Sequence, residues 1–210
     1  MGIFVPLSIL LPIGMFIYKN NYSDRPLTTI FCYLVAAGLI NATAVTLARN
    51  GIRNLPLLHL YTIVETIFFL SYFYLIFNSA KIKRFLIYVM IAFAIFCIIN
   101  LAFIQSIFTH NTHTRPLEAL IITSVCLLYL YKTRFSEDWL SSPINWINVG
   151  ILMYFPAASL IFILSNYFTF IMTDEQMTDL IWNLHAFMVF GMYLFFTKAF
   201  SLIERVKKDV

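Results

Sequence analysis

The stretch FLIYVMIAFAIFCIINLAFIQSIF, residues 85–108, contains no charged residue and is long enough to cross a lipid bilayer. A membrane-spanning helix needs about 20 predominantly apolar residues, with a range of roughly 17–25. The chain holds similar runs on both sides of it, and the full set covers Ile3–Tyr18, Leu27–Leu47, Leu55–Phe77, Phe85–Phe108, Pro116–Tyr131, Trp146–Phe170 and Asp179–Leu202. We therefore predict an all-α, polytopic membrane protein with seven transmembrane helices, of which the first and fifth are the shortest.

The composition of the chain excludes an ordinary soluble fold. Of its residues 61% are hydrophobic and 11% are charged, whereas soluble domains average roughly 45–50% apolar and about 25% charged residues. A soluble fold of this size could not bury so much apolar surface, but a lipid bilayer accepts it. The connections between the runs are short, so residues 1–210 are predicted to form a single seven-helix transmembrane domain with the bilayer as its main partner.

The basic residues predict the orientation of the helices. Eleven Lys and Arg residues fall on one side of the predicted bundle, and three, Arg49, Arg53 and Arg115, fall on the other. Short loops rich in Lys and Arg stay in the cytoplasm. We therefore expect the N-terminus outside and the C-terminus in the cytoplasm, in the inner (cytoplasmic) membrane of a cell. The net charge of +4 comes from these short clusters, which do not form the basic face of a nucleic-acid-binding protein.

Glu65 is the clearest candidate for a functional residue, because ionisable groups at membrane depth are costly. It lies ten residues into the third run, roughly 15 Å along the helix at about 1.5 Å per residue. Tyr61 lies one helical turn earlier on the same face. We expect the carboxyl group to be protonated or hydrogen-bonded. Either a structural interhelical hydrogen bond or a role in binding or proton coupling would explain it.

Other polar residues fall in the outer parts of neighbouring runs. His59 and His185 lie in the outer thirds of the third and seventh runs, Glu118 begins the fifth, and Asn166 lies near the outer end of the sixth. Each has a structural explanation, such as an acid in the first turn of a helix, but together they predict a pocket open to the outside. The predicted ligand-binding residues are His59, Tyr61, Glu65, Glu118, Asn166, Trp182 and His185.

Motifs of soluble enzymes are missing from the sequence. It contains no HExxH, GxSxG, P-loop or dinucleotide-binding pattern, so we assign no catalytic residue and leave the cofactor unknown. The two histidines and two glutamates of the predicted pocket are acceptable ligands for zinc or iron. An intramembrane metal-dependent hydrolase is therefore a third hypothesis, although we predict no metal site.

The third and seventh runs share a pattern, since each carries Leu-His near its outer end and basic residues at its inner end. A parallel repeat of three helices, one linking helix and three helices, as in small sugar and vitamin transporters, would place these two runs in equivalent positions. Asn145 and Asn148 add polar groups at the inner end of the sixth run. Pro156, further along that run, predicts the loss of one backbone hydrogen bond and a kink.

Three segments carry a resemblance: HLYTIVETIFFLSYFY (59–74), WINVGILMYFPAASLIFILSN (146–166) and IWNLHAFMVFGMYLFFTKAF (181–200). They resemble a group of small seven-helix membrane proteins of Bacteroidota-type bacteria whose function is not established, some of which appear near sensor histidine kinases. The resemblance implies the seven-helix topology and a role in sensing.

Our leading hypothesis is a receptor-like or sensory membrane module that binds a small or lipidic ligand and acts through a signalling or membrane-protein partner. The alternative is a small-solute transporter with the repeat described above.

Overall fold

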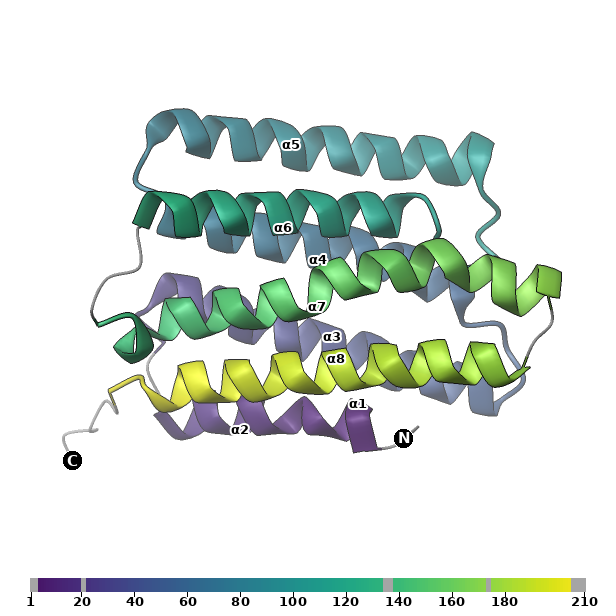
Figure 1. The fold of residues 1–210 in the computed structure, drawn as a ribbon, viewed down its shortest axis with the longest axis horizontal. Coiled ribbons are helices and arrows are strands. Elements are labelled where there is room, and N and C mark those ends of the chain that lie inside the picture. The colour runs from purple at the N-terminus through teal and green to yellow at the C-terminus, as the bar shows by residue number, and fades with distance from the viewer. Residues whose placement is uncertain (1–3, 20–21, 134–137, 173–174, 205–210) are drawn as a thin grey trace.

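The structure, a computed structural model, describes residues 4–19, 22–133, 138–172 and 175–204. All regular secondary structure in these residues is helical. Figure 1 shows the elements, which are α1 (Phe4–Ser8), α2 (Leu10–Lys19), α3 (Arg25–Arg49), α4 (Leu55–Ile76), α5 (Ala80–Ile99), η1 (Asn100–Ile104), α6 (Thr114–Thr133), η2 (Trp139–Ser141), α7 (Pro143–Asn166), η3 (Tyr167–Met172) and α8 (Glu175–Ser201).

Six of the described helices are long and apolar enough to cross a membrane. They are α3, α4, α5 with its π-helical continuation η1, α6, α7 and α8, and they correspond to the second to seventh predicted runs. The N-terminal run forms a shorter apolar helix, Val5–Lys19, divided into α1 and α2. The chain is thus a multi-pass helical membrane protein by the length and composition of its helices.

The fourth helix ends earlier than predicted. It stops at Ile104 instead of Phe108, and Gln105 turns into an extended conformation. The side-chain amide of Gln105 then donates hydrogen bonds to the carbonyl of His110, at 2.7 Å, and to the hydroxyl of Thr112, at 2.9 Å. These bonds hold a compact loop between α5 and α6.

The fifth helix begins earlier than predicted, at Thr114. The side-chain oxygen of Asn111 accepts hydrogen bonds from the backbone N–H of Thr114, at 3.2 Å, and from its hydroxyl, at 2.6 Å. This side chain therefore satisfies an otherwise free N–H at the helix start. As a result Arg115, which the charge count assigned to an outer loop, lies inside the first turn of α6 and is 3% exposed.

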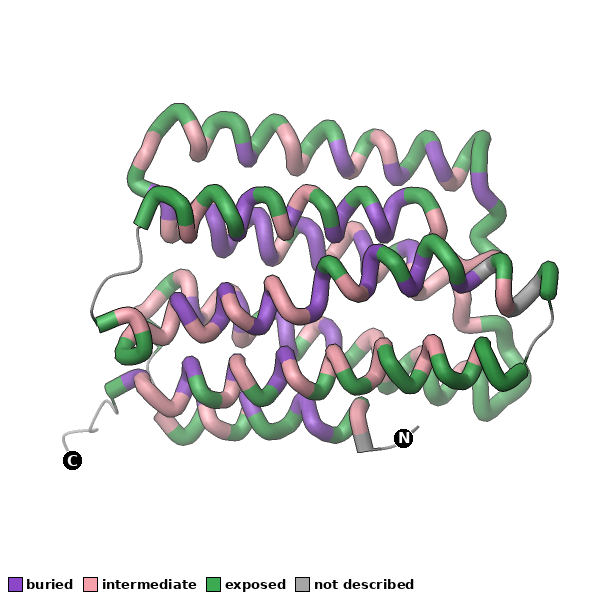
Figure 2. Tube along the Cα trace, viewed as in Figure 1, coloured by how far each residue is buried: buried purple, intermediate pink, exposed green. Residues whose placement is uncertain are grey.

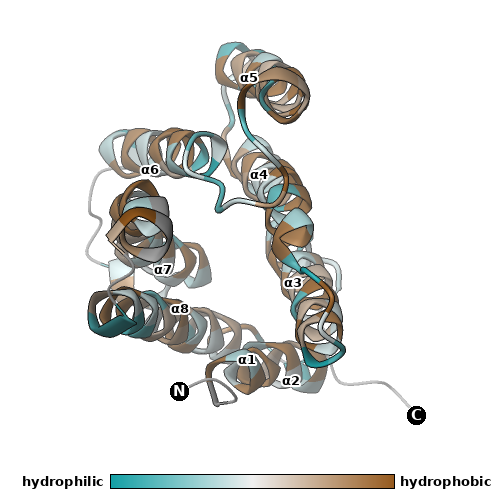
Figure 3. Ribbon diagram, turned by 90° about the vertical axis from the view of Figure 1, so that its right-hand side faces the viewer, coloured by the Kyte–Doolittle hydropathy of each residue, from teal (hydrophilic) through white to brown (hydrophobic). Residues whose placement is uncertain are grey.

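Six helices form a closed ring, which Figure 3 shows from one end of the bundle. Contacts follow the order α2, α3, α4, α6, α7, α8 and return to α2, while α5 lies outside the ring, mainly against α4. Figure 2 shows the consequence for α5, which is exposed along most of its length. Many of its exposed side chains are large and apolar, for example Ile91 and Ile98, as expected of a surface that faces lipid.

The helices α7 and α8 pack closely because glycine lies at their interface. A Cβ atom added to Gly150 would lie 2.8 Å from the ring of Phe196, and one added to Gly191 would lie 2.3 Å from the end of the Met153 side chain. Small residues let helices approach in this way in lipid. Pro156 lies further along α7, which continues through it as one helix, so its missing N–H interrupts the hydrogen-bond ladder without ending the helix.

Candidate functional site

A cavity of about 810 Å³ lies between α3, α4, α7 and α8, in the half of the bundle that contains the end of α3 and the start of α8. The pair α1/α2 packs against α3 and α8 and borders the cavity through Val5 and Pro6. The short N-terminal helix thus fills the space between α3 and α8 over part of their length. The cavity, here called the α3–α8 cavity, occupies the rest.

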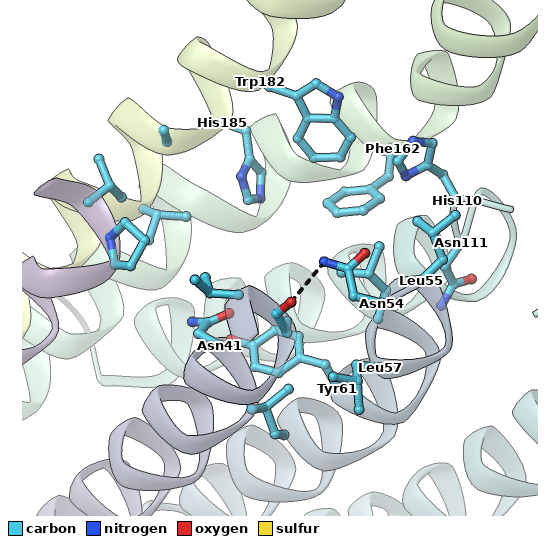
Figure 4. A pocket seen from close by; sticks show the side chains of 18 of the residues that line it. Asn41, Asn54, Leu55, Leu57, Tyr61, His110, Asn111, Phe162, Trp182 and His185 are labelled. Carbon is cyan, nitrogen blue, oxygen red and sulfur yellow. Dashed lines mark hydrogen bonds between the residues drawn. The ribbon is translucent and has the colours of Figure 1, made fainter. Parts of the chain in front are cut away.

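Aromatic and polar side chains face one another across the α3–α8 cavity, as Figure 4 shows. Trp182 and His185 come from α8 and Phe162 from α7, while Tyr61 and Asn41 come from α4 and α3 on the other side. The rings of Trp182 and Phe162 lie edge to face against His185, with centroids 5.7 and 5.5 Å from that of the imidazole. A pocket of this size, with mainly apolar walls and several polar groups, is typical of small-molecule sites.

Arg115 is the centre of the polar groups beside the cavity. Its Nη1 donates to a carboxylate oxygen of Glu65 on α4, and at 2.6 Å to a carboxylate oxygen of Glu118 on its own helix. Its Nη2 donates to the hydroxyl of Tyr154 on α7 at 2.6 Å. The guanidinium also lies over the rings of Tyr61 and Phe162, in each case 5.3 Å from the ring centroid. Arg115 therefore joins three helices and contributes to the cavity wall.

Glu65 has a full set of donors. Its Oε1 accepts hydrogen bonds from the hydroxyl of Tyr33 on α3, at 2.5 Å, and from the hydroxyl of Tyr61, at 2.8 Å. Its Oε2 accepts from Arg115. The carboxyl group is fully buried, so these three donors replace the water that a carboxylate would otherwise bind.

Glu118 lies on the other side of the guanidinium and is also fully buried. Its Oε2 accepts from Arg115, and its Oε1 lies 2.8 Å from the hydroxyl oxygen of Thr66 on α4. The amide of Asn111 donates to the hydroxyl of Thr62, one turn before Thr66, at 3.0 Å. The side chains of Glu118 and Asn111 therefore both hold the start of α6 against α4.

The polar network reaches α8 through Tyr154. The hydroxyl of Tyr154 lies 3.2 Å from Nε2 of His185, whose ring forms part of the cavity wall. One continuous chain of contacts therefore runs from Tyr33 on α3 through Glu65 and Arg115 to Tyr154 and His185. We call the seven residues Tyr33, Tyr61, Glu65, Arg115, Glu118, Tyr154 and His185 the polar network.

Five of the predicted site residues lie at the α3–α8 cavity or in the polar network beside it. Tyr61, Trp182 and His185 line the cavity, and Glu65 and Glu118 lie behind the wall, joined to it by Arg115. His59 points elsewhere, because its Nε2 lies 3.2 Å from the carbonyl oxygen of Thr109 in the loop between α5 and α6. The last predicted residue, Asn166, has a side chain outside the described part of the structure.

Sequence reasoning missed three members of the polar network. Arg115 was counted as a loop cation, although its position three residues before Glu118 in a helix start is a usable signal. Tyr33 and Tyr154 are two of the twelve tyrosines, and nothing in their local sequence distinguishes them. Their role depends on which helices are neighbours.

The four residues named above as acceptable metal ligands do not form one cluster. Among the described residues, no three His, Cys, Asp or Glu side chains lie close enough together to hold a metal ion. His59 contacts the loop after α5, His185 contacts Tyr154, and the two glutamates share Arg115 instead.

His110 closes the cavity at its loop end, where it lies outside the membrane-spanning helices. Its ring centroid is 5.2 Å from that of Trp182. Burial lowers the pKa of His110 below its ordinary value, because a charged imidazolium is poorly solvated there. The ring is therefore neutral at pH 7 and packs as an aromatic surface.

No protein family, no curated protein and no solved structure matches this chain.

Proposed function

We propose that the chain is a receptor-like, seven-span module of the cytoplasmic membrane that binds a small or lipidic ligand in the α3–α8 cavity. The observation that supports this most is the polar network beside the cavity, which joins α3, α4, α6, α7 and α8 by hydrogen bonds and ion pairs. A ligand that moves His185 or Tyr61 would change contacts on all five helices. Such coupling of a ligand to helix positions is what a membrane receptor needs.

The cavity favours an amphiphilic ligand. Its walls on α3 and α8 include Ala44, Val45, Ala186 and Val189, which offer an apolar surface to a hydrocarbon group. Among its polar groups, Tyr61, Arg115, Tyr154 and His185 lie together. The hydrogen bonds of Arg115 to Glu65, Glu118 and Tyr154 use both N–H groups of Nη1 and one of Nη2, so within the described residues the guanidinium keeps donor capacity for a ligand oxygen.

The proposed orientation places the α3–α8 cavity at the outer face of the membrane. The basic residues at the other end of the bundle support this, because Lys and Arg favour the cytoplasmic side. The short helix α1/α2 would then be the first span, entered from outside. With the cavity outside and a C-terminus in the cytoplasm, the module would pass its signal to a membrane-protein or signalling partner.

A small-solute transporter is the second candidate, and the helix order supports it. In the ring, α2, α3 and α4 follow one another as α6, α7 and α8 do, and the contacts between α4 and α6 and between α8 and α2 close it. With α5 outside, this is the helix order that a parallel repeat of three helices, one linking helix and three helices would produce.

The ligand-binding proposal can be tested by filling the cavity. The purified protein, wild type and variants, is released from membranes in a mild detergent and examined for bound small molecules and lipids by native mass spectrometry. Ala186→Trp places a large ring in the cavity, and Ala92→Trp places one on the exposed face of α5 as the matched control. We expect a molecule that is bound by wild type and Ala92→Trp and lost from Ala186→Trp. The same bound species in all three proteins would contradict the proposal.

A second measurement distinguishes a transporter from a receptor. The molecule identified in this way is added outside vesicles that contain the reconstituted protein. Accumulation inside the vesicles that Ala186→Trp abolishes would establish a transporter, and saturable binding without accumulation would establish a receptor.

A further inference from the structure

The hydroxyl group of Thr66 has two oxygen atoms within hydrogen-bond distance. The carbonyl oxygen of Thr62 and Oε1 of Glu118 each lie 2.8 Å from Oγ1 of Thr66. A hydroxyl group carries one proton and can also accept hydrogen bonds, whereas a carbonyl oxygen only accepts. If Thr66 donates to Thr62, as helical threonines commonly do to the residue four before, the contact with Glu118 needs a proton that comes from Glu118.

The charges around Arg115 lead to the same requirement. Glu65 and Glu118 both contact Nη1 of the one guanidinium, and all three side chains are at most 4% exposed. Two carboxylates and one guanidinium leave one negative charge unbalanced at membrane depth, where an unpaired charge is costly. One proton on either carboxyl group makes the cluster neutral.

The two carboxyl groups differ in their partners. Glu65 accepts hydrogen bonds on both of its oxygens, from two tyrosine hydroxyls and from Arg115, so these contacts need no proton from Glu65 itself. Glu118 accepts from Arg115 on Oε2 only, and its Oε1 faces the hydroxyl of Thr66. We propose that Glu118 is a proton-binding site, neutral at pH 7, which donates its proton to Thr66 while Glu65 is the ionised partner of Arg115.

Among the residues that the structure describes, no cation other than Arg115 faces Glu118. The groups that face it are Glu65 on α4, Arg115 on its own helix, Cys97 on α5 and Tyr154 on α7. Of these described groups, Arg115 alone carries a positive charge. Because Arg115 also lines the α3–α8 cavity, loss of the proton from Glu118 to water changes the charge beside the cavity by one unit. The site thus links the pH to whatever the cavity holds.

Infrared spectroscopy of the full chain in lipid nanodiscs tests this inference without any ligand. A neutral carboxylic acid has a carbonyl stretch that is well separated from the bands of a carboxylate. We expect such a band in the wild-type protein at pH 7, and we expect it to shift when the glutamate carboxyl groups are labelled with ¹³C. Glu118→Gln removes the band. Thr66→Val moves it, because the acid loses its hydrogen-bond acceptor.

The matched control is Thr197→Val on α8, since the Thr197 hydroxyl also donates to the carbonyl four residues before, at 2.7 Å. We expect Thr197→Val to leave the frequency of the neutral-acid band unchanged. A wild-type spectrum without a neutral-acid band at pH 7, a band that survives Glu118→Gln, or a band that Thr66→Val does not move would each overturn the inference. Should Glu118→Gln fail to fold, the isotope shift and Thr66→Val still decide it.

Discussion

Tyr154 on α7 and His185 on α8 lie 3.2 Å apart, from the hydroxyl oxygen to Nε2, and through this contact the buried guanidinium of Arg115 reaches the wall of the cavity. The hydroxyl accepts from Nη2 of Arg115 on its other side, at 2.6 Å. It therefore lies between the guanidinium of Arg115 and the imidazole of His185, and the orientation of one depends on the other.

Removal of that hydroxyl should lower stability. Tyr154→Phe leaves an N–H of Arg115 without its partner, and a lost hydrogen bond of this kind in a membrane protein costs about 1–2 kcal/mol. We expect a lower midpoint of thermal unfolding in detergent. Tyr131→Phe is the control, because Tyr131 is 82% exposed and its hydroxyl can be replaced without such a loss. Equal unfolding midpoints for the two variants would show that the Tyr154 hydroxyl does not contribute to stability.

The two glutamates of the polar network should compensate for each other. In Glu118→Gln, Arg115 keeps the carboxylate of Glu65, and in Glu65→Gln the carboxyl group of Glu118 can release its proton and become the counter-ion, so each change should be mild. The double variant leaves a buried guanidinium without a counter-ion, which costs about 3–5 kcal/mol.

The measurement is a double-mutant cycle of unfolding in detergent. A loss in the double variant that equals the sum of the two single losses would contradict the shared ion pair. A double variant that recovers its stability when Arg115 is also changed to Met would support it further.

Much of the fold follows from local sequence. The lengths and apolar character of six helices indicate membrane spans without any knowledge of packing. The depth of Glu65 and its spacing from Tyr61 follow from helix geometry, and the structure joins these two side chains by a hydrogen bond of 2.8 Å. These features depend on one helix at a time.

The site itself depends on which helices are neighbours, and the sequence does not contain that directly. Tyr33 and Tyr154 reach Glu65 and Arg115 only because α3 lies beside α4 and α7 beside α6. Arg115 was misassigned because a count of loop charges treats a cation at a helix start as solvated. Its burial is possible because it contacts two glutamates, on α4 and α6, that the count does not consider.

The interface of α7 and α8 should tolerate no added atom at Gly150. A Cβ there would lie 2.8 Å from the Phe196 ring and 3.3 Å from the backbone oxygen of Met192, so the helices must separate. Gly150→Ala should cost about 1–3 kcal/mol. Gly14→Ala on α2 meets nothing within 4 Å and should be neutral or slightly stabilising, since alanine favours helices by about 1 kcal/mol over glycine. Unfolding midpoints that rank the two variants in the opposite order would count against this packing.

The proposed orientation can be checked with reporter fusions after Val210. With the C-terminus in the cytoplasm, a fluorescent protein that matures only there should be bright, and a phosphatase that is active only outside should be silent. The physical reason is the concentration of Lys and Arg at that end of the bundle. A silent fluorescent fusion beside an active phosphatase fusion, at equal expression, would reverse the assignment.

The α3–α8 cavity should be wet and open to the outside. A thiol reacts as a thiolate, which forms in water and not in hydrocarbon. In a background where Cys32, Cys97 and Cys126 are replaced, Ala186→Cys in the cavity wall should react with a charged, membrane-impermeant maleimide added to right-side-out vesicles. Ala92→Cys, on the exposed face of α5, should stay unlabelled, because lipid surrounds it. Labelling of Ala186→Cys only in inverted vesicles would place the cavity on the cytoplasmic side, and equal labelling at both positions would mean that the reagent does not report the cavity.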